Sequence, residues 1–387
     1  MSAHDPMRAV WRLAAATTLI VAAFGMVGPV LAILLQGRGW GTVAVGAFAM
    51  IPFAMVALLV PFMPRILSRL GIGHAYTVGC AMELAGALGY ALGDGIVVWA
   101  MASVVSGAGA AGLWNATEAL LARRAPPERR GRVMGLYQTL LGASLAAGPF
   151  VPAVFGLEAR TVLWVACGVT AAACVVGLLA GVNEEAGGAD DSPGAVTGMW
   201  QALRAVPALG FVAFSGGVFE AGLSSVSAAH ASGTGLALGA AASVAGALGI
   251  GSFACQYPAG LAADRYPLHA VFKVCGSALL VASIGFGLSA HAPWLLWACA
   301  LVWGGVGGAL YTLTMIGVAH RFAGQATAAG TAAMITGYTM GGAVGPVASG
   351  SALQWGGVTG LAAALGAVAL TVIAVARRVD AQASQPA

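Results

Sequence analysis

The chain has 387 residues and a formal net charge of +4, yet 59% of its residues are hydrophobic and only 8% are charged. A soluble domain carries about 25% charged residues, so polar side chains cannot cover the surface of this chain in water. The composition excludes a water-soluble globular protein and predicts an all-α protein embedded in a lipid bilayer.

The first apolar run follows Arg8 and Arg12 and continues to about Leu35, which is too long for the apolar core of a signal peptide. It is therefore predicted to be the first spanning helix. Because a bilayer core needs about 20 mainly apolar residues per helix, the sequence predicts twelve transmembrane helices. They lie near residues 11–35, 42–63, 74–93, 97–122, 133–156, 161–182, 205–229, 237–262, 270–290, 294–318, 328–352 and 358–376.

The distribution of basic residues orients these spans. With the amino terminus in the cytoplasm, 15 of the 17 Lys and Arg residues lie in cytoplasmic segments, and only Arg38 and Arg160 lie outside. An eleven-span arrangement would put the termini on opposite sides, and one missed helix would invert every later loop. The sequence therefore predicts a multi-pass protein of the inner membrane with both termini in the cytoplasm.

The one long polar segment, Asn183–Thr197, contains four acidic residues together with glycine and proline. This composition is typical of a flexible, solvated linker; the alternative is an acidic regulatory segment. Because six spans precede it, the sequence predicts an amino-terminal bundle of residues 1–182, a cytoplasmic linker of residues 183–204 and a carboxy-terminal bundle of residues 205–387.

The two halves repeat one another along the chain. Four features match at an offset of 196 or 197 residues: Arg69 with Arg265, Ser68 with Asp264, Gly148-Pro149 with Gly345-Pro346, and Trp114 with Tyr311. Many transporter folds consist of a duplicated helical unit. The sequence therefore predicts two pseudo-symmetric six-helix bundles.

The segment Gly260–Arg265 (GLAADR), after the eighth span, resembles the loop signature G-x-L-A-D-R-x-G-R-R of the major facilitator superfamily. The resemblance implies two bundles that alternate access to a central cavity. It also implies gating roles at the cytoplasmic face for Asp264 and Arg265, and for Arg69 in the matching first-half loop. In that loop Ser68 replaces the acidic residue with which the family locks its outward-open state.

The fifth span contains Gly142-x5-Gly148-Pro149, which is similar to the G-x-x-x-G-P element of drug:proton antiporters. The preceding segment Pro127–Tyr137 resembles the cytoplasmic loop that enters span 5 in the superfamily. Proline removes a backbone donor, so Gly148-Pro149 and Gly345-Pro346 are predicted to bend spans 5 and 11. Such bends would act as hinges when the halves rock. The alternative is close packing of small residues.

Three carboxyl groups fall inside predicted spans, those of Glu83, Glu118 and Glu220. An ionised group at the bilayer centre costs at least about 2.5–3.5 kcal/mol, so each is expected to face protein or water. A carboxyl that exchanges a proton for a substrate couples transport to a proton gradient, which indicates H+ as the coupling ion. Glu220, near the middle of span 7, and Glu118 are the expected carriers. For Glu220 the alternative is a carboxyl that fixes helix packing.

Span 4 contains Trp114, Asn115 and Glu118 within little more than one helical turn. Because Trp114 and Glu118 lie one turn apart, an aromatic ring and a carboxyl point the same way, an arrangement that suits a cationic or amphipathic ligand. The alternative is a structural ion pair between Glu118 and an arginine of the following loop. Further ligand candidates on spans expected to line the cavity are Gln256, Tyr311 and Tyr338.

The sequence contains no phosphate-binding loop, nucleic-acid motif or metal-ligand spacing, so neither a cofactor nor a metal site is expected. We predict a monomeric, non-enzymatic secondary transporter whose partners are a small-molecule substrate, protons and the lipid bilayer, without nucleic acid. The expected substrate is a small, partly apolar organic solute, and the family resemblance favours efflux. The alternatives are an importer of a nutrient or a metal chelate, and a non-transporting membrane assembly factor on the same scaffold.

Overall fold

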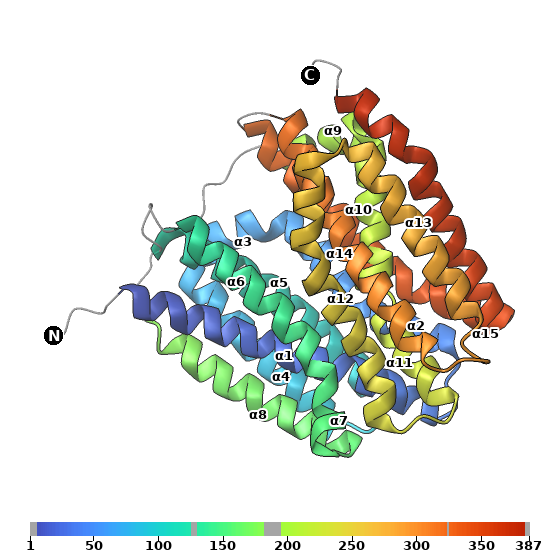
Figure 1. The fold of residues 1–387 in the computed structure, drawn as a ribbon. Coiled ribbons are helices and arrows are strands. Elements are labelled where there is room, and N and C mark those ends of the chain that lie inside the picture. The colour runs from blue at the N-terminus through green and yellow to red at the C-terminus, as the bar shows by residue number, and fades with distance from the viewer. Residues whose placement is uncertain (1–5, 125–129, 182–194, 323–324, 384–387) are drawn as a thin grey trace.

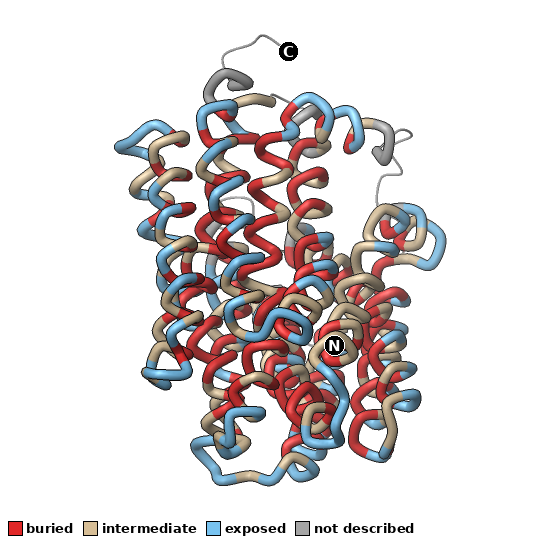
Figure 2. The backbone as a smooth tube through the Cα atoms, turned by 90° about the vertical axis from the view of Figure 1, so that its right-hand side faces the viewer, coloured by how far each residue is buried: buried red, intermediate tan, exposed pale blue. Residues whose placement is uncertain are grey.

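A computed structural model describes residues 6–124, 130–181, 195–322 and 325–383, and every regular element in these residues is a helix. Figure 1 shows the helices of the first half, coloured blue to green, grouped beside those of the second half, coloured yellow to red. Buried residues fill the interior of each group (Figure 2). The predicted all-α architecture of two helical bundles is confirmed.

The first half begins with one unbroken helix and contains two spans that are continued by short helical segments. Its elements are α1 (Pro6–Gly37), α2 (Thr42–Leu59), η1 (Val60–Phe62), α3 (Met63–Leu70), α4 (Ile72–Leu92), α5 (Ile96–Arg124), α6 (Arg130–Ala147), η3 (Gly148–Phe150), α7 (Val151–Phe155) and α8 (Ala159–Leu178). The sharp turn from α3 into α4 is made at Gly71, whose φ of 78° suits glycine because it has no Cβ.

The second half follows a short helix that precedes the seventh span. Its elements are α9 (Ala195–Ala205), α10 (Pro207–Glu220), α11 (Ser224–Gly233), α12 (Leu238–Arg265), α13 (Leu268–Gly287), α14 (Leu295–Arg321) and α15 (Gln325–Ala383). Gly357 interrupts α15 with a non-helical backbone (φ 61°, ψ −161°), so α15 consists of two helices.

The described helices account for the twelve predicted spans. Ten stretches of the described residues are long and apolar enough to cross a membrane, and the one at Ala329–Val379 counts as two spans because Gly357 divides it. The remaining span is α4, which has 21 residues and packs along α5. His74 and Glu83 make α4 less apolar than its neighbours.

The seventh span differs from the single helix predicted over residues 205–229. Pro207 begins α10, at a position where its missing N–H leaves no donor unsatisfied, and α10 ends at Glu220 before α11 begins at Ser224. The predicted linker also differs where it is described, because residues 195–205 form α9. The rest of that linker, residues 183–194, and the loop segment 125–129 lie outside the described residues.

The two halves are in close contact at one end of the molecule, where α2 meets α15. The Thr42 hydroxyl donates a hydrogen bond to the Gly350 carbonyl (2.7 Å), and the Val43 amide donates to Gln354 Oε1 (3.1 Å). A Cβ on Gly46 would overlap the carbonyl group of Pro346, so the two backbones touch there. We call this contact the α2–α15 junction.

The opposite end of the molecule carries the arginines of the cytoplasmic segments predicted from the sequence. Arg65, Arg69, Arg123 and Arg265 are all exposed there. In Figure 1 the helices of the two halves converge toward the bottom right and diverge toward these arginine-bearing ends, at the left and the top. The molecule is therefore closed at the α2–α15 junction and spread apart at its arginine-bearing end.

The two arginines predicted to lie outside the cytoplasm share one acidic partner. Asp94, in the turn between α4 and α5, pairs with Arg38 (Nη2–Oδ1 2.5 Å) and lies 3.8 Å from Arg160 Nη1. The hydrogen bond and charge of Arg38 hold the pKa of the Asp94 carboxyl below its ordinary value. Arg38 also stacks 4.6 Å above the ring of Trp99. This cluster joins the turn after α1, the turn between α4 and α5, and the start of α8.

Candidate transport site

Glu220 occupies the end of α10, where the seventh span is broken. Its carboxylate accepts a hydrogen bond from the Ser252 hydroxyl of α12, and the Tyr338 side chain of α15 lies close by. Gln256, one turn beyond Ser252, donates from Nε2 to the Ser252 hydroxyl (3.3 Å). Gly307 of α14 packs against the Cβ of Glu220, where a larger residue would not fit. Four helices of the second half thus surround this carboxyl.

Glu118 is held by side chains of α5 and α6. The Trp114 indole donates from Nε1 to Glu118 Oε1 (2.7 Å), and Gln138 Nε2 donates to the same oxygen (3.2 Å). The Trp114 side chain is 41% exposed, although it lies in the interior of a spanning helix. Among the described residues both bonding partners are neutral, which favours the ligand-site interpretation of Glu118 over the alternative of an arginine ion pair.

Tyr311 lies near both carboxyl groups. It lies on α14, within electrostatic range of both Glu118 from the first half and Glu220 from the second. Its ring packs against that of Tyr338, with the centroids 4.8 Å apart. Two acids, one from each half, and a group of aromatic rings thus lie near Tyr311, and we call this group the inter-bundle site.

Most of the ligand residues predicted from the sequence belong to the inter-bundle site. Its members are Trp114, Glu118, Gln138, Glu220, Ser252, Gln256, Tyr311 and Tyr338. The Asn115 amide donates to the Ala111 carbonyl of its own helix (2.8 Å), and its role in ligand binding stays a prediction. Ser252 was missed, although its position one turn before Gln256 places the two side chains together on α12.

Glu83, the third carboxyl in the spans, lies elsewhere. It is 8% exposed and accepts a hydrogen bond from the Ser106 hydroxyl (2.9 Å), between α4 and α5 inside the first bundle. The Tyr90 hydroxyl donates a second hydrogen bond between the same two helices, to the Ser103 hydroxyl (3.0 Å). Glu83 therefore joins two neighbouring helices and does not face the space between the bundles.

The residues predicted to gate the molecule lie at its arginine-bearing end. Arg69 ends α3 in the first half, whereas Asp264 and Arg265 end α12 in the second, and all three side chains are exposed. α3 packs against η1, α4 and α5 of its own half. The gating role of these residues concerns another conformation and stays a prediction.

The two predicted Gly-Pro bends differ in the structure. Gly148-Pro149 begins the 3-10 turn η3, which separates α6 from α7, and a Cβ on Gly148 would lie 2.5 Å from the Ala22 carbonyl oxygen of α1. Gly345-Pro346 lies within a continuous part of α15, against α10 and α2. Both positions allow close packing, and their use as hinges stays a prediction.

Comparison with known proteins identifies the family. The family model described as Major Facilitator Superfamily matches residues 13–333. An uncharacterized MFS-type transporter of Bacillus subtilis (strain 168), YfkF, is 25% identical over 338 residues, which cover 85% of this chain and 85% of the relative.

Solved structures share the fold at low sequence identity. A crystal structure of the nucleoside transporter NupG has a TM-score of 0.78 and 12% identity, covering 97% of this chain and 99% of that one. A bacterial homolog of the human lysosomal transporter Spinster, in an inward-facing and unoccupied conformation, has a TM-score of 0.67 and 15% identity, covering 98% and 97%.

Proposed function

Because the chain belongs to the major facilitator superfamily and is therefore a secondary transporter, we propose that it exports a small, partly apolar organic solute across the inner membrane in exchange for protons. Glu220 is the principal proton carrier in this proposal, and Glu118 is the second. The solute binds at the inter-bundle site, against Trp114 and Tyr311.

The observation that carries the proposal is that one carboxyl from each half lies near Tyr311 and, among the described residues, bonds only neutral partners. Glu118 bonds Trp114 and Gln138, and Glu220 bonds Ser252. A carboxylate without a fixed cationic partner is neutralised either by a proton or by a positively charged group of a ligand. Competition between the two for one carboxyl is sufficient to couple their movements.

The shape of the molecule supports alternating access. If the arginine-bearing end faces the cytoplasm, as basic residues do in most membrane proteins, the two bundles are spread apart on the cytoplasmic side in this conformation. Glu220 ends a broken helix, and substrate and ion sites of transporters are commonly built from such breaks near the bilayer midplane. Rocking the bundles apart at the α2–α15 junction would open the same site to the other side.

Proteoliposome flux tests the proposal directly. We expect a panel of organic solutes, assayed with and without a pH gradient, to include one whose movement requires the gradient. Glu220→Gln should abolish gradient-driven flux and Glu118→Gln should slow it, because each removes an exchangeable proton. Glu83→Gln is the matched control and should retain flux, because Glu83 lies away from the site. Equal loss in all three variants would contradict these assignments.

Import is the second candidate function. The fold neighbour NupG is a nucleoside transporter, and the fold is compatible with movement of a nutrient or a metal chelate in either direction. In the same liposomes, a solute that moves in the same direction as the protons, instead of the opposite direction, would favour import. If no solute moves and none stabilises the purified protein, the chain would fit the non-transporting assembly factor considered from the sequence.

A further inference from the structure

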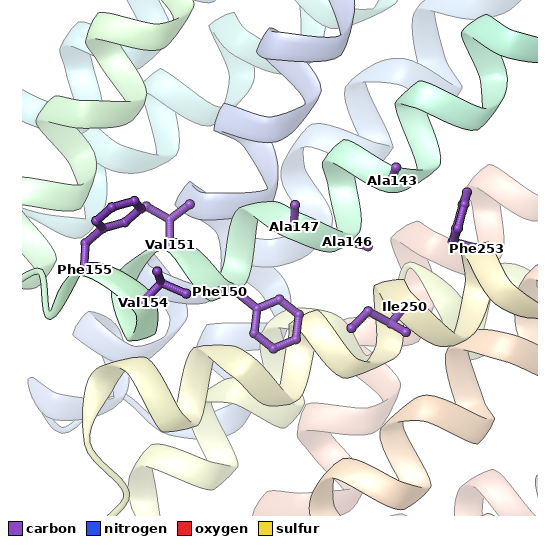
Figure 3. A pocket seen from close by; sticks show the side chains of 9 residues that line it. All are labelled: Ala143, Ala146, Ala147, Phe150, Val151, Val154, Phe155, Ile250 and Phe253. Atoms are coloured by element: carbon purple, nitrogen blue, oxygen red, sulfur yellow. The ribbon is translucent and has the colours of Figure 1, made fainter.

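The six cysteines of the chain all lie within helices and are free thiols. Five of them are buried, and the sixth, Cys255 of α12, is partly exposed. Cys255 lies two residues after Phe253, which Figure 3 shows beside an apolar crevice of about 440 Å³ between α6 and α12. Solutes that dissolve in the bilayer therefore meet Cys255 more readily than the other thiols.

Two of the buried thiols meet between α4 and α8, inside the first bundle. Cys80 of α4 is 2% exposed and Cys174 of α8 is 6% exposed. The Cys174 thiol donates a hydrogen bond to the Cys80 carbonyl oxygen (3.5 Å), and the two side chains lie near each other. Because the two residues are 94 positions apart in the sequence, the packing of α4 against α8 creates this pair.

A second contact of the same two helices holds the thiol pair in register. Tyr76 lies one turn before Cys80 on α4, and Gly177 lies about one turn after Cys174 on α8. The Tyr76 hydroxyl lies directly against Gly177, where a larger residue would not fit. Two successive turns of α4 and α8 are thus matched. Figure 1 shows α8 along the outer edge of the first-half helices, so this contact is remote from the second half.

The hydroxyl of Tyr76 gives the thiol pair a third polar group. The Tyr76 side chain is completely buried, and its hydroxyl has no hydrogen-bond partner among the described residues. It lies near the Cys80 thiol. A buried polar group without a partner is unfavourable. A ligand that bonds both sulfur atoms and also offers an oxygen to Tyr76 would therefore satisfy all three groups.

We propose that Cys80 and Cys174 form a dithiol site that binds trivalent arsenic. Arsenous acid, As(OH)3, is uncharged at neutral pH, so it enters the apolar bundle without the cost of burying an ion. The two thiols give up their protons, two As–S bonds form, two As–O bonds break, and two water molecules leave. Arsenic stays trivalent, and the product carries no charge. Its remaining oxygen accepts a hydrogen bond from Tyr76.

The composition of the site disfavours the commoner thiol-bound metals. A structural zinc ion takes four protein ligands, and the described part of the chain contains no group of three or more His, Cys, Asp or Glu residues that could hold a metal. Cu(I) on two thiolates leaves a net negative charge, which is costly among apolar helices. Trivalent arsenic needs only two protein sulfur atoms and forms a neutral adduct.

Arsenic bound per chain, measured by elemental mass spectrometry after gel filtration, tests the site. The protein is first reduced with a phosphine, which adds no competing thiol, and then treated with arsenite. A variant that keeps only Cys80 and Cys174, and so lacks the exposed Cys255, should bind one arsenic. Replacing either remaining cysteine by Ser or by Ala should reduce arsenic to background. Tyr76→Phe should weaken binding about fivefold, the effect of losing one hydrogen bond.

Cys167→Ser in the otherwise unchanged chain is the matched control, because Cys167 also lies on α8 and is also 6% exposed; it should bind arsenic as the wild type does. Bound arsenic joins α4 to α8, so it should raise the Tm of the two-cysteine variant, and a small dithiol should reverse the rise. Absence of arsenic from that variant would overturn the proposal. So would binding that survives the loss of either cysteine in a protein that elutes normally. These measurements do not depend on transport.

Discussion

Three carboxyl groups in the spans of this protein have different surroundings. Glu83 bonds Ser106 between two neighbouring helices of one bundle, whereas Glu118 and Glu220, from different halves, both lie near Tyr311. All three are single acids in apolar runs, so the sequence could not separate them by pattern. What separates them is the face of the helix that each occupies, and that face is set by how the helices pack.

Trp114 is expected to contribute to ligand binding through its ring as well as its N–H. Trp114→Leu should weaken binding of an organic cation by about threefold to thirtyfold, the range of a cation–π contact, measured as the equilibrium dissociation constant. Trp114→Phe should recover much of that loss, because it restores the aromatic face. Trp164→Leu, at a 46% exposed position on α8, is the control, and equal losses at both tryptophans would indicate a general effect of the bilayer surface.

Several helices of this chain approach one another closely at glycines, which have no side chain. The sequence predicts the spans well because each apolar run is long enough to cross a bilayer. It does not predict the break after Glu220, since the glycines there, at 216, 217 and 222, resemble many others in the chain. Similarly, the pairing of Asp94 with Arg38 and Arg160 joins two turns and the start of α8, which are far apart in the sequence, and no local pattern predicts it.

The α2–α15 junction provides a test at the level of two helices. Gly46→Ala should prevent their close approach, because the added methyl group overlaps the Pro346 carbonyl. We expect faster labelling of a cysteine at the buried position 353 by a maleimide, in a background without native cysteines, as the junction spends more time open. Gly350→Ala should act alike, since its Cβ would overlap the Thr42 carbonyl.

Gly37→Ala is the control for both variants, because a Cβ there meets no other atom within 4 Å. Unaltered labelling in Gly46→Ala and Gly350→Ala, with thermal stability preserved, would mean that the junction accommodates the added methyl group without opening.

The Asp94 cluster should make stability depend on pH. The pKa of Asp94 is lowered by Arg38 in the folded protein, so its contribution is present above the unfolded pKa of about 3.9 and is lost as pH falls through the lower folded value. Asp94→Asn should therefore have a lower Tm than the wild type at neutral pH, and the difference should shrink on acidification. A difference in Tm that does not change with pH would exclude the ion pairs as its source.

The whole molecule adopts one of the two arrangements that alternating access requires. Its twelve-span plan and family could be predicted from hydropathy, basic residues and the repeated loop. The end at which the bundles meet could not, because one sequence must encode both arrangements with similar free energies. The inter-bundle site could be predicted only in part. Its acids can be identified in the sequence, but their position near Tyr311 depends on how the two halves pack together.

A covalent bridge across the closed end should stop the cycle. With native cysteines replaced, Thr42→Cys and Gln354→Cys joined by a short reducible cross-linker should lose transport and regain it on reduction, because the bundles must separate there. Each single cysteine, treated in the same way, should keep its flux. Transport that continues in the bridged protein would show that this end stays closed throughout the cycle.

In the proposed exchange, the neutral bonding partners of the two carboxyl groups among the described residues would also affect how the cycle responds to voltage. If one proton enters for each monovalent cation that leaves, no net charge moves and only the pH difference supplies energy. If both Glu118 and Glu220 carry protons, one extra positive charge moves inward per cycle, worth about 2.3 kcal/mol for every 100 mV of membrane potential. Replacing Glu118 alone would then convert a carrier that responds to voltage into one that responds only to the pH difference.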